Sequence, residues 1–210
     1  MYKSDYYLVE PIKWKILEQN NNTYKLVSDV ILDQSVFYED WQNNRTINNN
    51  KIYPNNYEYS NIRAWLNGYD GSSYKVNNYT GKGFIDIAFT EEERKLINKT
   101  LVGNYASTTA SETNNYACNN TLDKVYLLSY QDVTDKYFTT ANERQTKVTD
   151  YAKAKGVYEN SNRYGIFWLR SPHDYYSYYA YYVSSYSNVY SHDCDYSDTG
   201  ARPALEITIK

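Results

Sequence analysis

Several residue types that often reveal a protein's class are scarce in this 210-residue chain. It has two cysteines, Cys118 and Cys194, which lie 76 positions apart and outside any CxxC pair. That spacing gives no support to a disulfide framework or a structural zinc site. No apolar run is long enough to cross a membrane, and no apolar stretch follows residues 1–5. We therefore expect neither direct membrane insertion nor a secretory signal, and the localisation stays open among a phage particle, a cell surface reached through a partner or longer chain, and the cytoplasm.

An excess of positive charge is also missing. The chain has 22 basic and 25 acidic residues, so its formal net charge is −3, and we expect no nucleic-acid partner. What is abundant is tyrosine, with 28 residues, and aromatic residues make up 18% of the chain. This composition excludes collagen, a coiled coil and an ordinary disordered tail. We expect a soluble, folded protein.

Strand patterns lie at both ends of the chain. Apolar residues alternate with lysines in 9–16, Asn20–Asn22 is typical of a turn, and a second strand is predicted over 24–32. Near the other end, the nearly continuous apolar run 165–171 predicts a central buried strand, and 204–209 alternates again. The pattern predicts a single α+β domain over 1–210, with the N- and C-terminal strands paired in one sheet.

Short helices and long loops fill the region between these strands. Ser60 and Gly68 are typical of the start and end of a helix, and Thr90 with Glu93 forms a capping-box pattern. Further helix starts are predicted at Ser129 and Thr149, the second ending at Gly156. Loops are predicted over 40–60 and 103–120. The four tryptophans are expected in the core because their neighbours are apolar.

Residues 173–198, which we call the tyrosine-rich segment, differ from the rest of the chain. Nine of these 26 residues are Tyr, six are Ser and four are Asp, whereas Lys, Arg, Glu, Gln, Trp and Met are absent. Tyr, Ser and Asp together are typical of an adaptable recognition surface, because tyrosine offers a large rigid ring at little entropic cost. A buried core would have to provide partners for nine phenol hydroxyls. A low-complexity, aggregation-prone tract is the alternative.

The sequence around this segment resembles a bacterial and phage domain family. The resemblance depends on the C-terminal pattern Trp168-Leu169-Arg170-Ser171-Pro172 followed by Gly200-Ala201-Arg202-Pro203-Ala204-Leu205, and on similar motifs at 9–14, 62–66, 88–93 and 149–152. The family has a C-type-lectin-like fold, in the branch of the formylglycine-generating enzymes. Its members include the variable proteins of diversity-generating retroelements, whose ligand-binding region is rewritten by adenine-directed mutagenesis.

This resemblance implies a role for the tyrosine-rich segment. Mutation of the first two bases of AAC or AAT codons gives Asn, Tyr, Ser, Asp, His and Cys but never Lys, Glu, Gln, Met or Trp, and those five types are missing from 173–198. It also implies that Ala180, Val183, Ser185 and Val189 are framework positions. The chain departs from the family at Ser187, where many relatives have a turn glycine.

We therefore predict a non-enzymatic receptor or adhesion-type protein that needs no cofactor and binds a protein or cell-surface ligand. The predicted ligand-binding residues all lie in the tyrosine-rich segment. They are Asp174, Tyr175, Tyr176, Tyr178, Tyr179, Tyr181, Tyr182, Ser184, Tyr186, Asn188, Tyr190, His192, Asp193, Asp195 and Tyr196. The alternative is a carbohydrate-binding or cell-wall-associated lectin module with a fixed glycan ligand, since tyrosine rings also stack on sugars.

Catalytic and metal-binding alternatives find little support in the residues. His192-Asp193-Cys194-Asp195 contains possible zinc ligands, but neighbours in an extended segment point to alternate faces, so we expect four surface positions and no metal site. Formylglycine-generating enzymes need paired catalytic cysteines, whereas Cys118 and Cys194 are isolated in the sequence. The Glu-Pro-Asn and Gln-Pro-Asp motifs of calcium-dependent lectins do not occur.

Overall fold

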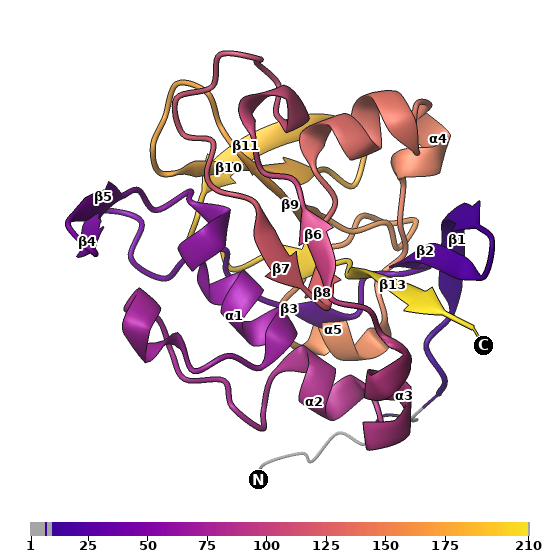
Figure 1. The fold of residues 1–210 in the computed structure, drawn as a ribbon. Coiled ribbons are helices and arrows are strands. Elements are labelled where there is room, and N and C mark those ends of the chain that lie inside the picture. Colours follow the sequence, from indigo (N-terminus) through magenta and orange to yellow (C-terminus); the bar gives the residue numbers. More distant parts are fainter. Residues whose placement is uncertain (1–6, 8–9, 210) are drawn as a thin grey trace, which may run out of the picture.

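The structure is a computed structural model that describes residue 7 and residues 10–209. Its sheets contain strands from both ends of the chain (Figure 1). Val9, at the start of the first predicted strand, and residues 1–5 lie outside the described part. The strands are β1 (Trp14–Asn20), β2 (Thr23–Ser28), β3 (Asp33–Gln34), β4 (Arg45–Ile47), β5 (Asn50–Ile52), β6 (Thr100–Val102), β7 (Thr121–Asp123), β8 (Val125–Tyr126), β9 (Phe167–Pro172), β10 (Tyr179–Val183), β11 (Val189–Asp193), β12 (Gly200–Ala201) and β13 (Ala204–Thr208).

The helices are all short, and none among the described residues is long and apolar enough to cross a membrane. They are η1 (Tyr57–Tyr59), α1 (Asn61–Asn67), η2 (Gly71–Tyr74), α2 (Phe84–Ala88), α3 (Glu91–Leu96), η3 (Ala106–Thr108), η4 (Asp132–Lys136), α4 (Ala141–Arg144) and α5 (Asp150–Ala154). The predicted α+β class is confirmed.

The first sheet joins the two ends of the chain, as predicted. Its order is β1-β2-β13-β8, and β13 pairs antiparallel with both β2 and β8. The turn between β1 and β2 places Asn21 in the left-handed region with φ 52°, a conformation that asparagine tolerates. The second strand is shorter than predicted, because the chain leaves the sheet after Ser28 and turns towards β3.

A β-bulge interrupts the regular pairing of β1 with β2. The register between β1 and β2 shifts between Ile16 and Glu18. Leu17, the extra residue at this point, packs against the core, whereas Ile16 is exposed. The alternation over 9–16 predicts that Ile16 lies on the buried face of the strand, and this prediction is wrong.

The second sheet has the order β11-β10-β9-β12-β3, and its central strand β9 is buried on both faces. Phe167 and Leu169 of β9 pack into a core shared with the first sheet, whereas Trp168 packs on the other face beneath α1 and α2. The run 165–171 is apolar because neither face of this strand meets water. Trp168 is fully buried, as predicted, whereas the other three tryptophans are only partly buried.

Capping residues fix the helices where the sequence predicts them. The Ser60 hydroxyl accepts the Arg63 amide at the start of α1, and Gly68 ends that helix with φ 63°. The predicted helix starts at Thr90, Ser129 and Thr149 are also confirmed. The region 40–60 is not the single loop predicted, because β4, β5 and η1 lie within it; 103–120 is irregular apart from η3.

Candidate functional site

The tyrosine-rich segment forms the hairpin β10–β11 and the loops on either side of it, at the opposite end of the view in Figure 1 from α2 and α3. The structure spreads the predicted binding residues over three environments. Exposed residues are Tyr175, Tyr176, Tyr186, Asn188 and Tyr190. Half-buried residues are Asp174, Tyr178, Tyr179, Tyr182, His192, Asp193, Asp195 and Tyr196. Tyr181 and Ser184 are buried.

Three residues expected at the surface are inside the molecule. Tyr181 packs in the core between the sheets, where its ring meets Tyr130 at 4.9 Å and its hydroxyl donates to Asp174 at 3.1 Å. In β10, Ala180, Tyr181 and Val183 are buried, whereas Tyr179 and Tyr182 are half-buried. Ser184 is 8% exposed, and Cys194 is fully buried in the core cluster that also contains Trp168, so the expectation that these side chains face solvent is wrong.

An aromatic cluster forms around His173, which begins the loop between β9 and β10. The imidazole lies within ring-contact distance of four tyrosines, including Tyr176 at 5.3 Å between centroids. Its Nδ1 accepts the backbone amides of Tyr175 and Tyr176 at 3.0 and 3.2 Å. Trp41, which sequence reasoning placed in the core, extends the cluster by packing against Tyr178 at 5.5 Å.

We expect acidification to loosen this loop. Burial lowers the pKa of His173 against the opposing effect of Asp174, so the neutral ring is favoured in the fold. The loop contacts are therefore fully present above the ordinary histidine pKa of about 6.5 and are lost as pH falls through the lower folded value. Amide exchange at Tyr175 and Tyr176, corrected for intrinsic rates, should show protection at about pH 7.5 that is reduced at about pH 5.

The control for this prediction is His173→Asn. The asparagine oxygen can accept the same backbone amides but does not titrate in this range. Protection in this variant should stay constant between the two pH values. An equal loss of protection in wild type and variant would show that another group causes the change.

A second feature is a cleft of about 390 Å³, which we call the tyrosine cleft. Tyr182 of β10 and Tyr190 of β11 are directly paired across the hairpin, with ring centroids 6.3 Å apart. The residues lining it are Tyr158, Ile166, Tyr182, Ser184, Ser185, Tyr186, Asn188, Tyr190 and Tyr196. Sequence reasoning missed Tyr158 and Ile166, which lie outside the tyrosine-rich segment.

Two asparagines from distant parts of the chain hold the segment in place. Fully buried Asn55 donates its side-chain amide to the carbonyl oxygens of Tyr176 and Tyr179, at 3.0 and 3.2 Å. Buried Asn160 donates in the same way to Ser185 at 2.9 Å. No local pattern in the sequence distinguishes these two from the many other asparagines, so they could not be predicted.

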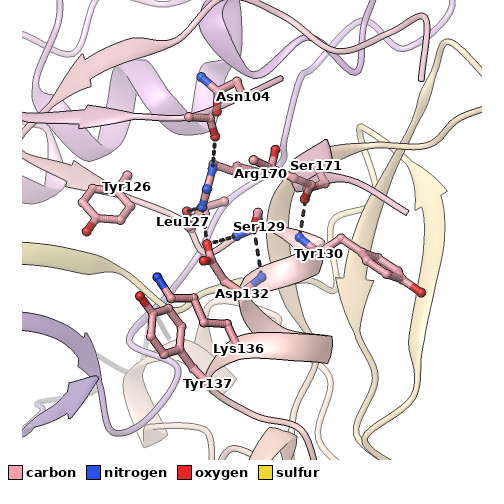
Figure 2. A network of polar contacts seen from close by, with 12 residues as sticks. Asn104, Tyr126, Leu127, Ser129, Tyr130, Asp132, Lys136, Tyr137, Arg170 and Ser171 are labelled. Atoms are coloured by element: carbon pink, nitrogen blue, oxygen red, sulfur yellow. Dashed lines mark hydrogen bonds and ion pairs between the residues drawn. The ribbon is translucent and has the colours of Figure 1, made fainter. Parts of the chain in front are cut away.

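A polar network beneath the hairpin connects β9 to the surrounding loops (Figure 2). The Arg170 guanidinium donates to the Asp132 carboxylate and to the carbonyl oxygen of Leu127, both at 2.8 Å. The Ser171 hydroxyl accepts the Tyr130 amide at 2.9 Å. Burial raises the pKa of Asp132, but Arg170 and the hydrogen bonds from Ser129 outweigh it and hold the pKa below its ordinary value.

The turn between β10 and β11 has an unusual backbone. Ser187 adopts φ 73°, the left-handed region that favours glycine, in the position where the family resemblance places a turn glycine. Its amide donates to Ser184, and its carbonyl oxygen accepts Arg144 at 2.8 Å. Of the expected framework residues, Ala180, Val183 and Ser185 are buried and Val189 is half-buried.

Reactive side chains do not gather at this site. In the described part of the chain, no three His, Cys, Asp or Glu residues are close enough together to hold a metal ion. Both cysteines are free thiols. Burial raises the pKa of Cys118 to about 11 and raises the pKa of Cys194 well above its ordinary value, so both thiols stay protonated at neutral pH.

Comparison with known proteins places the chain in a family. Searches of curated proteins and of solved structures give no match. A family model described as a domain of unknown function, DUF6273, matches residues 21–209. That match covers the whole tyrosine-rich segment and every strand of the two larger sheets except β1. The chain therefore belongs to the DUF6273 family.

Proposed function

We propose that this domain is a non-enzymatic binding protein whose contact surface is the exposed part of the tyrosine-rich segment. The observation that carries the proposal is the exposure of Tyr175, Tyr176, Tyr186 and Tyr190, which leave 78, 50, 66 and 53% of their surface open to solvent. These rings bury only part of their surface on folding, and each provides a large rigid contact for a partner. As central anchors they would each contribute about 1–3 kcal/mol to binding.

A rigid support beneath these rings favours the proposal over a low-complexity tract. The backbone of the segment pairs in the five-stranded sheet, and Asn55 and Asn160 hold its loops. A surface that is already ordered loses less conformational entropy on binding. Pairing of the N- and C-terminal strands in one sheet supports the C-type-lectin-like fold that we propose for the domain.

The same separation of exposed and buried residues supports retroelement-directed diversification. Substitution of an exposed tyrosine leaves the fold intact, whereas Ala180 and Val183 are fully buried and tolerate little change in volume. We propose that the outward side chains vary between copies of the gene and that these two residues do not.

Sequencing the gene from several isolates tests this proposal. We expect differences concentrated at Tyr175, Tyr176, Tyr186 and Tyr190, a near-copy of the coding segment with Asn codons there, and a reverse-transcriptase gene nearby. A segment that is identical in all isolates would overturn diversification.

A fixed glycan ligand is the second candidate, because serine and asparagine side chains line the tyrosine cleft beside the rings. Such a lining offers both stacking and hydrogen bonds to a sugar. A glycan array separates the two candidates. Saturable binding to one class of glycan, together with a constant segment, would favour the lectin module.

A further inference from the structure

The tyrosine cleft has a lining that points to one chemical class of ligand. Five phenol rings surround it, those of Tyr158, Tyr182, Tyr186, Tyr190 and Tyr196. Among the residues that the structure describes, none of those lining the cleft is charged. The face of an aromatic ring attracts a cation within about 6 Å of its centroid, by about 0.5–1 kcal/mol at exposed sites and about 2 kcal/mol where water is excluded.

Two of these rings are held in fixed positions before any ligand arrives. Tyr182 contacts the fully buried Trp168 edge-on, with centroids 6.2 Å apart. Tyr196 stacks on His192, with centroids 3.8 Å apart and ring planes within 15°. Because these contacts already fix the side chains, a ligand that binds between the rings loses little affinity to their ordering.

The charges near the cleft have the sign that attracts a cation. Tyr196 stands between Asp195 and Ser197, its amide donates to the Asp193 carbonyl oxygen at 3.0 Å, and Asp198 follows two positions later. The tyrosine-rich segment contains no Lys or Arg. Arg144 reaches the neighbouring turn, but its guanidinium donates to the carbonyl oxygens of Ser187 and Phe138, both at 2.8 Å.

The protonation state of the tyrosines in the cleft is also compatible with cation binding. Burial raises the pKa of Tyr196, and the negative charge of Asp198 and the phenol of Tyr158 raise it further. Burial also raises the pKa of Tyr182, with smaller effects from Tyr196 and Tyr190. These rings therefore stay neutral at physiological pH, where their faces are electron-rich without themselves being charged.

We propose that the tyrosine cleft binds an alkylammonium cation, held by cation–π contacts with Tyr182, Tyr190 and Tyr196 and by the field of the neighbouring aspartates. This inference rests on the proposed binding function and names the chemistry of its ligand. A quaternary ammonium group fits best, because its methyl groups contact ring faces without giving up strong hydrogen bonds to water.

Titration with choline chloride, and in parallel with its neutral isostere 3,3-dimethyl-1-butanol, tests the inference. The two probes have the same shape and differ in one charge. We expect saturable chemical-shift changes at Tyr182, Tyr190 and Tyr196, with choline binding on the order of tenfold more tightly than the alcohol. Peptides with lysine or trimethyl-lysine form a further arm, which shows whether the cation comes from a small molecule or a side chain.

Substitutions at Tyr190 separate a cation–π site from a merely apolar one. This side chain is half exposed, so neither variant should prevent folding. Tyr190→Phe keeps the aromatic ring and should keep the preference for choline, whereas Tyr190→Leu should lose most of it. Tyr175→Leu is the matched control, because Tyr175 lies in the same segment but outside the cleft lining.

Equal binding of choline and the alcohol, or no binding of either cationic probe, would overturn the cation site. Loss of choline binding in Tyr190→Phe would overturn the cation–π assignment in favour of a hydroxyl contact. Neither result affects the proposed diversification of the exposed residues, which is tested separately by the variation between isolates.

Discussion

Replacing Arg170 with leucine is expected to lower the free energy of unfolding by about 3–5 kcal/mol. The guanidinium is 7% exposed and forms an ion pair with Asp132, and it also donates to the carbonyl oxygens of Gly103 and Leu127. Leucine would leave the Asp132 carboxylate buried without its counter-charge and two backbone carbonyls without a donor. Since small domains are stable by only about 5–15 kcal/mol, this loss is a large share of the total stability.

Chemical denaturation of wild type and variant measures this loss. Arg94→Leu is the matched control, because Arg94 and Asp86 form a pair of nearly the same length, 2.9 Å, with side chains that are 32 and 21% exposed. Water screens that pair, so its loss should cost no more than about 1 kcal/mol. Equal effects at the two sites would show that burial does not determine the contribution of Arg170.

Tyr181→Ala is expected to destabilise the fold by about 3–5 kcal/mol, whereas replacing four other tyrosines of the same segment should not. Tyr181 fills space between the two sheets and contacts Tyr130, so its removal leaves a cavity. Tyr175, Tyr176, Tyr186 and Tyr190 are exposed, and alanine at each should change stability by about 0.5 kcal/mol or less.

Thermal and chemical unfolding of the single and the quadruple variant measure this contrast. Tyr181→Phe, which keeps the ring and removes only the hydrogen bond to Asp174, should cost about 1 kcal/mol. Tyr182 does not belong among the dispensable rings, because it packs against Trp168. A quadruple variant that unfolds as readily as Tyr181→Ala would contradict the proposed division between support and contact surface.

The elements that could be predicted are those whose structure depends on residues close together in the sequence. Ser60 and Gly68 bound a helix through their own backbone and side-chain contacts, and the apolar run 165–171 requires burial on both faces. The inward position of Leu17 in β1 could not be predicted, because the bulge between Ile16 and Glu18 depends on how β1 pairs with β2. The β4–β5 hairpin was missed because residues 40–60 are rich in Asn and Tyr, which also occur in loops.

The same limit applies to the candidate site. Composition alone singles out residues 173–198, but it does not show which tyrosines face inward. Tyr181 and Tyr182 are neighbours of one type, and only the layers packed on each face of β10 distinguish them. Tyr158, Asn55 and Asn160 reach the site from elsewhere in the chain through tertiary packing, which no local pattern records.

The position of β13 between β2 and β8 also constrains synthesis on the ribosome. Residues 204–208 are made after every other strand, so the first sheet cannot close until they have cleared the exit tunnel. Until then β2 and β8 have no strand between them, and such long-range pairing is slow. A chain cut short anywhere within 173–198 would lack this strand, and we expect quality-control proteases to remove it.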